Sequence, residues 1–276
     1  MVSDKDRRGR TEQSTNIHAA KKEGGVHGEA DLIEISAEKR EVMQKTLTQI
    51  LKRFNIDWKI MRAVMLTTGA VISGSVALAV LQAGEFVPQD LNIYVTSTNL
   101  AVLLIFLNEQ GYTVQMPKPT TTSDGYNRST VTLTLKNDAG ERIDLIATIE
   151  QHVIHTITQF HSTCVMNYIA YYGIVCLYPE WTMRKMGLVT NRPTDQQAID
   201  KYRGRGFAMV YRSEDLPGYE PNHQCGRHQC CLKTRRELRD HITLSVPLED
   251  VELSVHTDEG MVGWVLQKDY NCELAS

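Results

Sequence analysis

The chain has 276 residues, of which 42% are hydrophobic, and a formal net charge of −3. A chain of this length and composition can bury a sizeable core, and it suits one large domain or two small ones. The nearly balanced charge gives no global signature of nucleic-acid binding, and six cysteines in a chain this long do not predict a disulfide framework.

The amino-terminal part predicts neither a folded element nor a leader. Residues 1–30 are polar, rich in charge and glycine, and lack an apolar period, so we expect a disordered tail. Its "DRRGR" segment could belong to a targeting or nucleic-acid-binding patch, but a solvated tail is the simpler interpretation. No apolar stretch follows these basic residues, so a secretory signal is not expected. The apolar run 70–80 is too short to span a bilayer, which favours a cytoplasmic or nuclear protein without a membrane partner.

Next in the chain is a predicted amphipathic helix. Apolar residues recur at helical spacing over 37–54, and Ser36 is a suitable N-cap. The segment 63–73 should contain a strand that enters a turn at Gly74-Ser75. A short helix then follows and is closed by Gly84.

The middle of the chain alternates between predicted strands and helices. We expect a strand over 90–96, a helix over 99–111, a short strand over 112–116, a loop over 117–127, and two strands over 129–136 and 141–149. The turn "NDAG" between the last two predicts a hairpin. The following segment predicts a helix from about Ser162 and a strand over 174–177.

Polar residues interrupt two of these strands. Side chains alternate along a strand, so Asp90, Asn92 and Tyr94 share one face. Asp144 lies between apolar neighbours in the later strand. A charged residue in such a place costs free energy unless it is paired, exposed in a cleft or bound to metal. If the two strands are neighbours, Asp90 and Asp144 meet at one site.

Gly74-Ser75, Asp90-Leu91-Asn92 and Asp144 together resemble the nucleotidyltransferase fold shared by DNA polymerase β, poly(A) polymerases and many small relatives. That family has a Gly-Ser turn opening a helix, an Asp-x-Asp strand and a third Asp on a later strand. More narrowly, "ISGSVALAVL", "FVPQDLNIYV", "FHSTCVMNYIAYYG" and "CLYPEWT" are similar to segments of a large group of fungal proteins with no assigned activity. The resemblance covers residues 38–178, about half the chain.

The resemblance implies a binding site for a nucleoside triphosphate with Mg²⁺. The Gly74-Ser75 turn would hold the triphosphate through backbone N–H groups and the Ser75 hydroxyl. Asp90, Asn92 and Asp144 would hold the metal, with Asp90 and Asp144 as the catalytic carboxylates. Asn92 departs from the family, which has Asp or Glu at that position. An amide keeps an oxygen ligand but loses the charge, so we expect catalysis to be weakened or lost while the fold is retained.

The same residues also have interpretations without chemistry. A Gly-Ser pair before an apolar helix often forms only a turn and an N-cap. Asp90 could cap the entrance of its strand, and Asp144 could pair with Arg128, Lys136 or Arg142.

A basic cluster and a histidine extend the candidate site. Lys201, Arg203 and Arg205 are close together at a predicted helix end, where they could grip a triphosphate or an RNA backbone. They could equally be a solvated helix terminus whose cations favour the helix dipole. His161 could line the cleft, although a lone histidine is more often a satisfied core or surface residue.

The cysteines suggest little metal chemistry. Cys164 and Cys176 are expected to be buried free thiols. Five potential zinc ligands lie close together, namely His223, Cys225, His228, Cys230 and Cys231. Structural zinc sites usually use two separated ligand pairs, and here a distant partner such as Cys272 would be needed. Zinc is therefore not expected.

The sequence thus predicts an α/β (α+β) protein with a nucleotidyltransferase-like mixed sheet flanked by helices. We divide it into a tail (1–30), a core (31–178) and a smaller carboxyl-terminal extension (179–276). The leading function is metal-assisted nucleotide binding or nucleotidyl transfer, in weakened or lost form, with an acceptor that the sequence does not identify. The alternative is a non-catalytic scaffold or interaction protein that retains only the fold.

Overall fold

The structure is a computed structural model that describes residues 35–115, 130–190, 196–228, 230–248 and 262–267. The chain divides into two units, Met1–Leu32 and Ile33–Ser276, and every described residue belongs to the second. The predicted tail and the predicted loop over 117–127 lie outside the described residues.

The described elements are helices, 3₁₀ turns and strands, most of them short. The helices are α1 (Ala37–Arg53), α2 (Trp58–Thr68), α3 (Ser75–Leu81), α4 (Leu100–Glu109), α5 (Ile154–Ile157), α6 (Pro179–Met183) and α7 (Gln196–Arg203), and the 3₁₀ turns are η1 (Ser97–Asn99), η2 (Thr163–Val165) and η3 (Ser213–Asp215). The strands are β1 (Val71–Ser73), β2 (Asp90–Thr96), β3 (Thr113–Val114), β4 (Thr130–Lys136), β5 (Arg142–Thr148), β6 (Asn167–Ala170), β7 (Gly173–Cys176), β8 (Met186–Leu188), β9 (Ala208–Val210), β10 (Arg236–Glu237), β11 (Leu244–Pro247) and β12 (Gly263–Trp264).

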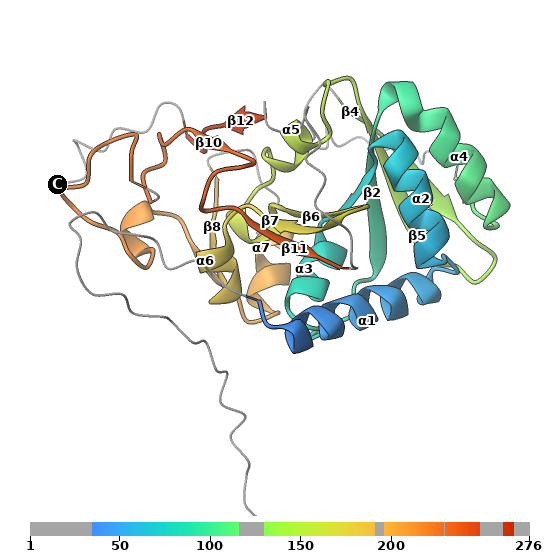
Figure 1. Ribbon diagram of the computed structural model, residues 1–276, viewed down its shortest axis with the longest axis horizontal. Helices are drawn as coiled ribbons and strands as arrows, with labels where there is room; N and C mark the ends of the chain where they lie inside the picture. The colour runs from blue at the N-terminus through green and yellow to red at the C-terminus, as the bar shows by residue number, and fades with distance from the viewer. Residues whose placement is uncertain (1–34, 116–129, 191–195, 229, 249–261, 268–276) are drawn as a thin grey trace, which may run out of the picture. The chain divides into compact units, whose positions relative to one another are not determined.

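One large mixed sheet organises the described residues (Figure 1). Its strand order is β11-β7-β6-β1-β2-β5-β4-β3. β2 and β5 run parallel to each other, whereas the other neighbouring strands in the sheet are antiparallel. β4 and β5 form the predicted hairpin. The predicted mixed sheet with flanking helices is therefore confirmed.

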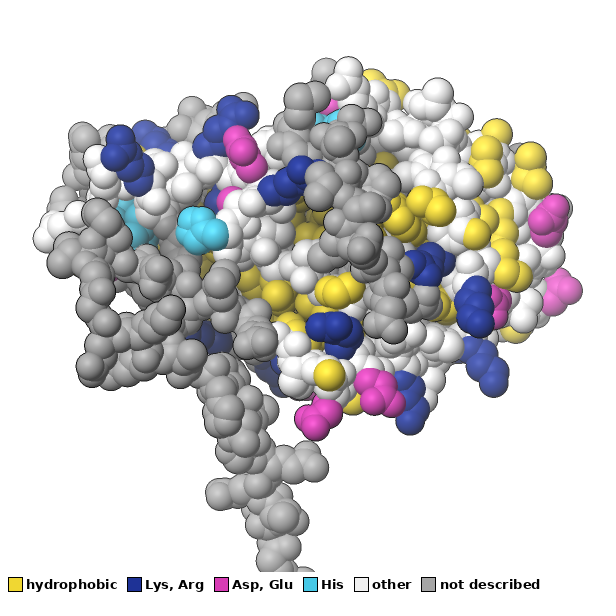
Figure 2. All heavy atoms as spheres, in the orientation of Figure 1, with side chains coloured by type: hydrophobic (Ala, Val, Ile, Leu, Met, Phe, Trp, Pro, Cys, Tyr) yellow, Lys and Arg dark blue, Asp and Glu magenta, His cyan; other side chains and the backbone are white. Residues whose placement is uncertain are grey.

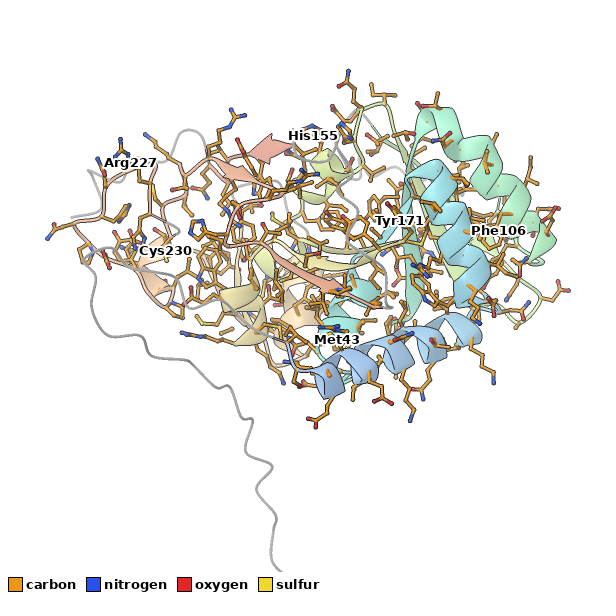
Figure 3. All side chains as sticks on the ribbon, in the orientation of Figure 1. Met43, Phe106, His155, Tyr171, Arg227 and Cys230 are labelled. Carbon is orange, nitrogen blue, oxygen red and sulfur yellow. The ribbon has the colours of Figure 1, made fainter. Side chains whose placement is uncertain are left out.

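Each face of the sheet has its own hydrophobic core. On one face, α1, α2 and α4 pack against alternate residues of the strands, such as Leu91 and Ile93 of β2. Met43 of α1 and Phe106 of α4, both labelled in Figure 3, belong to this core. On the other face, Tyr94 and Ile146 pack with α5, α6 and the segment around β12. Asp90 and Asn92 alternate with the first set, so they belong to the same face as Tyr94.

The first two helices have clear capping signals. The Ser36 hydroxyl accepts a hydrogen bond from the Lys39 backbone N–H, as predicted for the start of α1. Asp57 caps α2 in the same way, and Gly69 ends it with φ 65°. The sequence prediction missed α2. Within the segment 63–73, residues 63–68 are the end of α2 and only the last three residues form the predicted strand.

The helix predicted from about Ser162 is wrong. That segment forms the single turn η2 and then strand β6. β6 is fully buried between β1 and β7, so its side chains alternate between the two cores. The strand predicted over 174–177 is confirmed as β7, shifted by one residue.

The remaining predicted elements are present. α3 is followed by Gly84 with φ 81°, and α4 is followed by Gly111 with φ 85°. Both glycines adopt the left-handed conformation that closes helices. Among the described residues, no helix is long and apolar enough to cross a membrane.

Candidate functional site

The two strands that carry the predicted carboxylates are neighbours. β2 and β5 pair in parallel, so that Asp90 lies opposite Arg142 and Asn92 lies opposite Asp144. Partners in a parallel pair direct their side chains to the same face of the sheet. The alternation predicted from the sequence therefore brings the two aspartates and the asparagine together on one face.

The Gly74-Ser75 turn borders this group. β1 pairs with β2 so that Ser73 lies opposite Asn92, and Gly74 follows at the end of the strand. Gly74 has φ 69°, and a Cβ atom there would lie 3.0 Å from the Asn92 side-chain nitrogen. Only glycine suits both the backbone conformation and this close approach. The Ser75 hydroxyl, at the start of α3, donates to the Asp90 carboxylate at 3.4 Å.

Asp144 is held by a guanidinium group. Its Oδ1 accepts hydrogen bonds from the Thr134 hydroxyl at 2.7 Å and from Arg142 Nε at 3.0 Å. Its Oδ2 lies 2.7 Å from Arg142 Nη2. Of the partners that the sequence left open, Arg142 contacts Asp144, and Arg128 lies outside the described residues. The hydrogen bond to Asp144 raises the pKa of Arg142, burial opposes this, and the charges of Asp144 and Asp90 raise it further.

Two of the three predicted cations of the basic cluster lie near Asp90. Burial lowers the pKa of Lys201, Asp90 opposes that change, and the charges of Arg205 and Arg142 lower it further. Burial also lowers the pKa of Arg205, which Tyr202 and Asp90 oppose. These groups are therefore within electrostatic range of one another. We call Ser75, Asp90, Asn92, Arg142, Asp144, Lys201 and Arg205 the Asp90 cluster.

Arg203, the third predicted cation, interacts with other partners. Its guanidinium group donates to Asp200 at 3.1 Å and to the Tyr211 hydroxyl at 3.2 Å. Both hydrogen bonds are exposed to solvent. The helix turns by about 100° per residue, so alternate positions at its end cannot all face the same group.

Aromatic rings position Arg205. Its guanidinium carbon lies 4.0 Å from the centre of the Phe86 ring and 5.3 Å from that of Tyr202. Its Nη1 atom is buried and has no hydrogen-bond partner in the described part of the chain. Phe86 was not predicted to contribute, because it is far from Arg205 in the sequence and meets it only through the fold.

His161 lies beside the same group. Its ring centre is 5.6 Å from that of Tyr202. Burial, and then the charge of Lys201, lower the pKa of His161 to about 4. Its Nδ1 atom is buried without a hydrogen-bond partner among the described residues. His161 is thus neutral at physiological pH and lies next to the cations of the cluster.

The histidine and cysteine stretch lies in a separate part of the fold. The Cys225 and Cys231 sulfur atoms are 3.8 Å apart, and the Gly226 backbone N–H donates to the Cys231 sulfur. His223 Nδ1 bonds to the Glu220 carbonyl. Within the described residues, no group of three or more such side chains could hold a metal ion, and Cys272 lies outside them. Cys164 and Cys176 are buried free thiols, as predicted, and burial raises the pKa of each to about 12.

The Asp90 cluster does not fit the two metal ions that the resemblance implies. Such a site uses several carboxylates with oxygens available for coordination. Here Asn92 contributes no charge, and both oxygens of Asp144 are hydrogen-bonded. Asp90 is the one predicted carboxylate ligand in the described cluster that is not already bound to an arginine side chain.

Comparison with known proteins gives distant structural likenesses only. No family model and no curated protein matches the chain. The apo form of a CCA-adding enzyme is similar with 14% identity and a TM-score of 0.36, over 61% of this chain and 43% of that one. The Thermotoga maritima CCA-adding enzyme complexed with tRNA gives 15% identity and a TM-score of 0.41, over 62% and 43%. A tRNA nucleotidyltransferase complexed with a primer tRNA and an ATP analog gives 18% and 0.27, over 37% and 27%.

These neighbours are CCA-adding enzymes and a tRNA nucleotidyltransferase, and the chain spans less than half of their length. With TM-scores below 0.5, no residue role is transferred from them, and their tRNA and nucleotides are theirs alone. The narrower resemblance to fungal proteins has no counterpart in these comparisons and stays a prediction.

Proposed function

We propose that this protein binds a nucleoside triphosphate at the Asp90 cluster and that nucleotidyl transfer is weakened or lost. The observation that supports binding is the approach of Lys201 and Arg205 to Asp90 from a segment far later in the chain. Lys201 is exposed, whereas Arg205 is half-buried and its Nη1 atom has no hydrogen-bond partner in the described residues. A cation with a buried, unpartnered donor costs free energy unless an anion compensates it. Charge-assisted hydrogen bonds to phosphate oxygens are a strong form of that compensation.

Mg²⁺-assisted transfer is the more specific form of this hypothesis. In that form Asp90, Asn92 and Asp144 would have to supply the metal ligands, and Mg²⁺ would supply positive charge to the triphosphate. The missing charge at Asn92 and the pairing of Asp144 with Arg142 argue against efficient transfer. Binding without turnover is therefore the function that the residues favour.

Calorimetric titration tests this proposal. ATP, GTP, CTP and UTP are each titrated into the full chain with Mg²⁺ present, and at least one is expected to bind. Lys201→Gln and Arg205→Gln should each weaken that binding by about tenfold, as expected for the loss of a charge-assisted hydrogen bond. Arg203→Gln is the matched control and should bind like the parent. Failure of all four nucleotides to bind would refute the proposal.

A second candidate is an interaction protein that retains only the fold. Large apolar side chains are exposed on the neighbouring helices α2 and α4, where Leu66 is 55%, Val102 47% and Ile105 63% exposed. Figure 2 shows hydrophobic side chains gathered over this part of the surface. Light scattering measures self-association of the parent. If this face forms the contact, Ile105→Lys should reduce that self-association. Self-association together with no nucleotide binding would favour this candidate.

A further inference from the structure

The balance of charge in the Asp90 cluster is unusual for a nucleotidyltransferase fold. Two carboxylates, Asp90 and Asp144, face three cations, Arg142, Lys201 and Arg205. The described cluster therefore carries a net positive charge before any ligand binds. A site built to hold two divalent metal ions needs the opposite balance, because carboxylates must first attract the metal.

Arg142 occupies the Asp144 oxygens that a metal ion would need as ligands. It comes directly opposite Asp90 in the β2–β5 pair and donates to both oxygens of Asp144. A guanidinium group in this place carries a permanent positive charge. The bidentate pair is strong, and the Asp144 side chain is only 10% exposed, so a hydrated cation would have to displace Arg142 to reach it.

The guanidinium group also has donors to spare. Contact with Asp144 uses Nε and Nη2, whereas a guanidinium carries five N–H donors. The Arg142 side chain is 50% exposed, so its outer edge is accessible to a ligand. Arg205 adds a buried Nη1 without a partner in the described residues, and an unmade hydrogen bond of this kind is costly.

We infer that the Asp90 cluster binds the phosphate groups of its nucleotide without a divalent metal ion, with Arg142, Lys201 and Arg205 supplying the positive charge. This inference rests on the proposed nucleotide binding and adds what neutralises the phosphates. Asn92 is consistent with it, because a third carboxylate, at position 92, would add to the repulsion of a phosphate that no metal screens.

Titration in chelator tests the inference directly. The nucleotide that binds best is titrated into the full chain in EDTA and again in Mg²⁺. The two dissociation constants should agree within about threefold, which corresponds to a smaller free-energy difference than one hydrogen bond contributes. Mg²⁺ titrated alone should give no binding. Binding that requires Mg²⁺ would overturn the inference and leave the proposed function intact, whereas no binding in either buffer would refute both.

A pair of variants tests the role of Arg142. Arg142→Gln alone leaves Asp144 buried without its partner, so folding could fail. Arg142→Gln with Asp144→Asn replaces the ion pair by two amides and leaves the net charge of the cluster unchanged. This double variant should bind the nucleotide about tenfold more weakly in EDTA, while Arg203→Gln should not differ from the parent. A double variant that binds as tightly as the parent would overturn the role given to Arg142.

Discussion

Replacing Asn92 with Asp tests how close the cluster is to a metal site. Asn92 lies opposite Asp144 in the parallel pair, and neighbouring strands are about 4.8 Å apart. Two unit charges about 5 Å apart repel by about 3 kcal/mol at an effective dielectric constant of about 20. Arg142 already pairs with Asp144 and should offset most of this, leaving a loss of about 1 kcal/mol. In chelator, the Tm of Asn92→Asp should therefore fall by about 2–4 °C.

Mg²⁺ should reverse this loss in the variant but not affect the parent. Three carboxylates bind a divalent cation more tightly than two, and a ligand that binds only the folded state raises its stability. Thermal melts of both proteins in EDTA and in Mg²⁺, with and without nucleotide, measure the effect. Asn108→Asp, which adds the same charge at an exposed position of α4, is the control. If Asn92→Asp melts like the parent in every buffer, Asn92 does not face the carboxylates and the geometry of the cluster is wrong.

Three further predictions concern stability and metal content. His161 has a folded-state pKa of about 4 against 6.5 in the unfolded chain, so the unfolded state binds the proton first and stability should fall as the pH drops through this range. His161→Gln should flatten that part of a urea-denaturation profile against pH, and an unchanged profile would contradict the assignment. Arg236 is 3% exposed and pairs with Asp240, so Arg236→Met should lower the free energy of unfolding by about 3–5 kcal/mol, as measured in urea. Adding Asp240→Asn should recover part of that loss, and no recovery would mean that the pair is not the cause. Elemental analysis of the purified protein should find no stoichiometric zinc; one zinc per chain, lost on replacing the cysteines of 223–231 with serine, would show the opposite.

The sequence predicted those parts of the site that depend on local periodicity. Alternation along a strand places Asp90 and Asn92 on one face without any tertiary information. The short turn "NDAG" predicts that the strand carrying Asp144 pairs with the strand before it. The sequence left open whether the strands carrying Asp90 and Asp144 are neighbours and did not predict their parallel pairing, because no local signal specifies which distant strands meet.

The remaining features depend on contacts that no local pattern encodes. The sequence predicts a helix over β6 because its mostly apolar residues show no alternation, as expected for a strand buried on both faces between two partners. Lys201 and Arg205 could not be distinguished from Arg203, because their partners lie in distant segments. The sequence named Arg142 only as one of three possible partners for Asp144. The fold shows that Arg142 binds Asp144 and so adds a positive charge to the Asp90 cluster.

The origin of the cations in the Asp90 cluster would make the proposed nucleotide binding dependent on two separate stretches of chain. Both carboxylates lie within 31–178, whereas Lys201 and Arg205 belong to the segment at and beyond the end of α7. A fragment cut after residue 178 would keep the aspartates with Arg142 as their one remaining cation from the cluster, and the net charge would reverse. A bound anion would therefore contact both stretches and stabilise their association. By mass action it should slow proteolysis of the connection between them as well as raise the melting temperature.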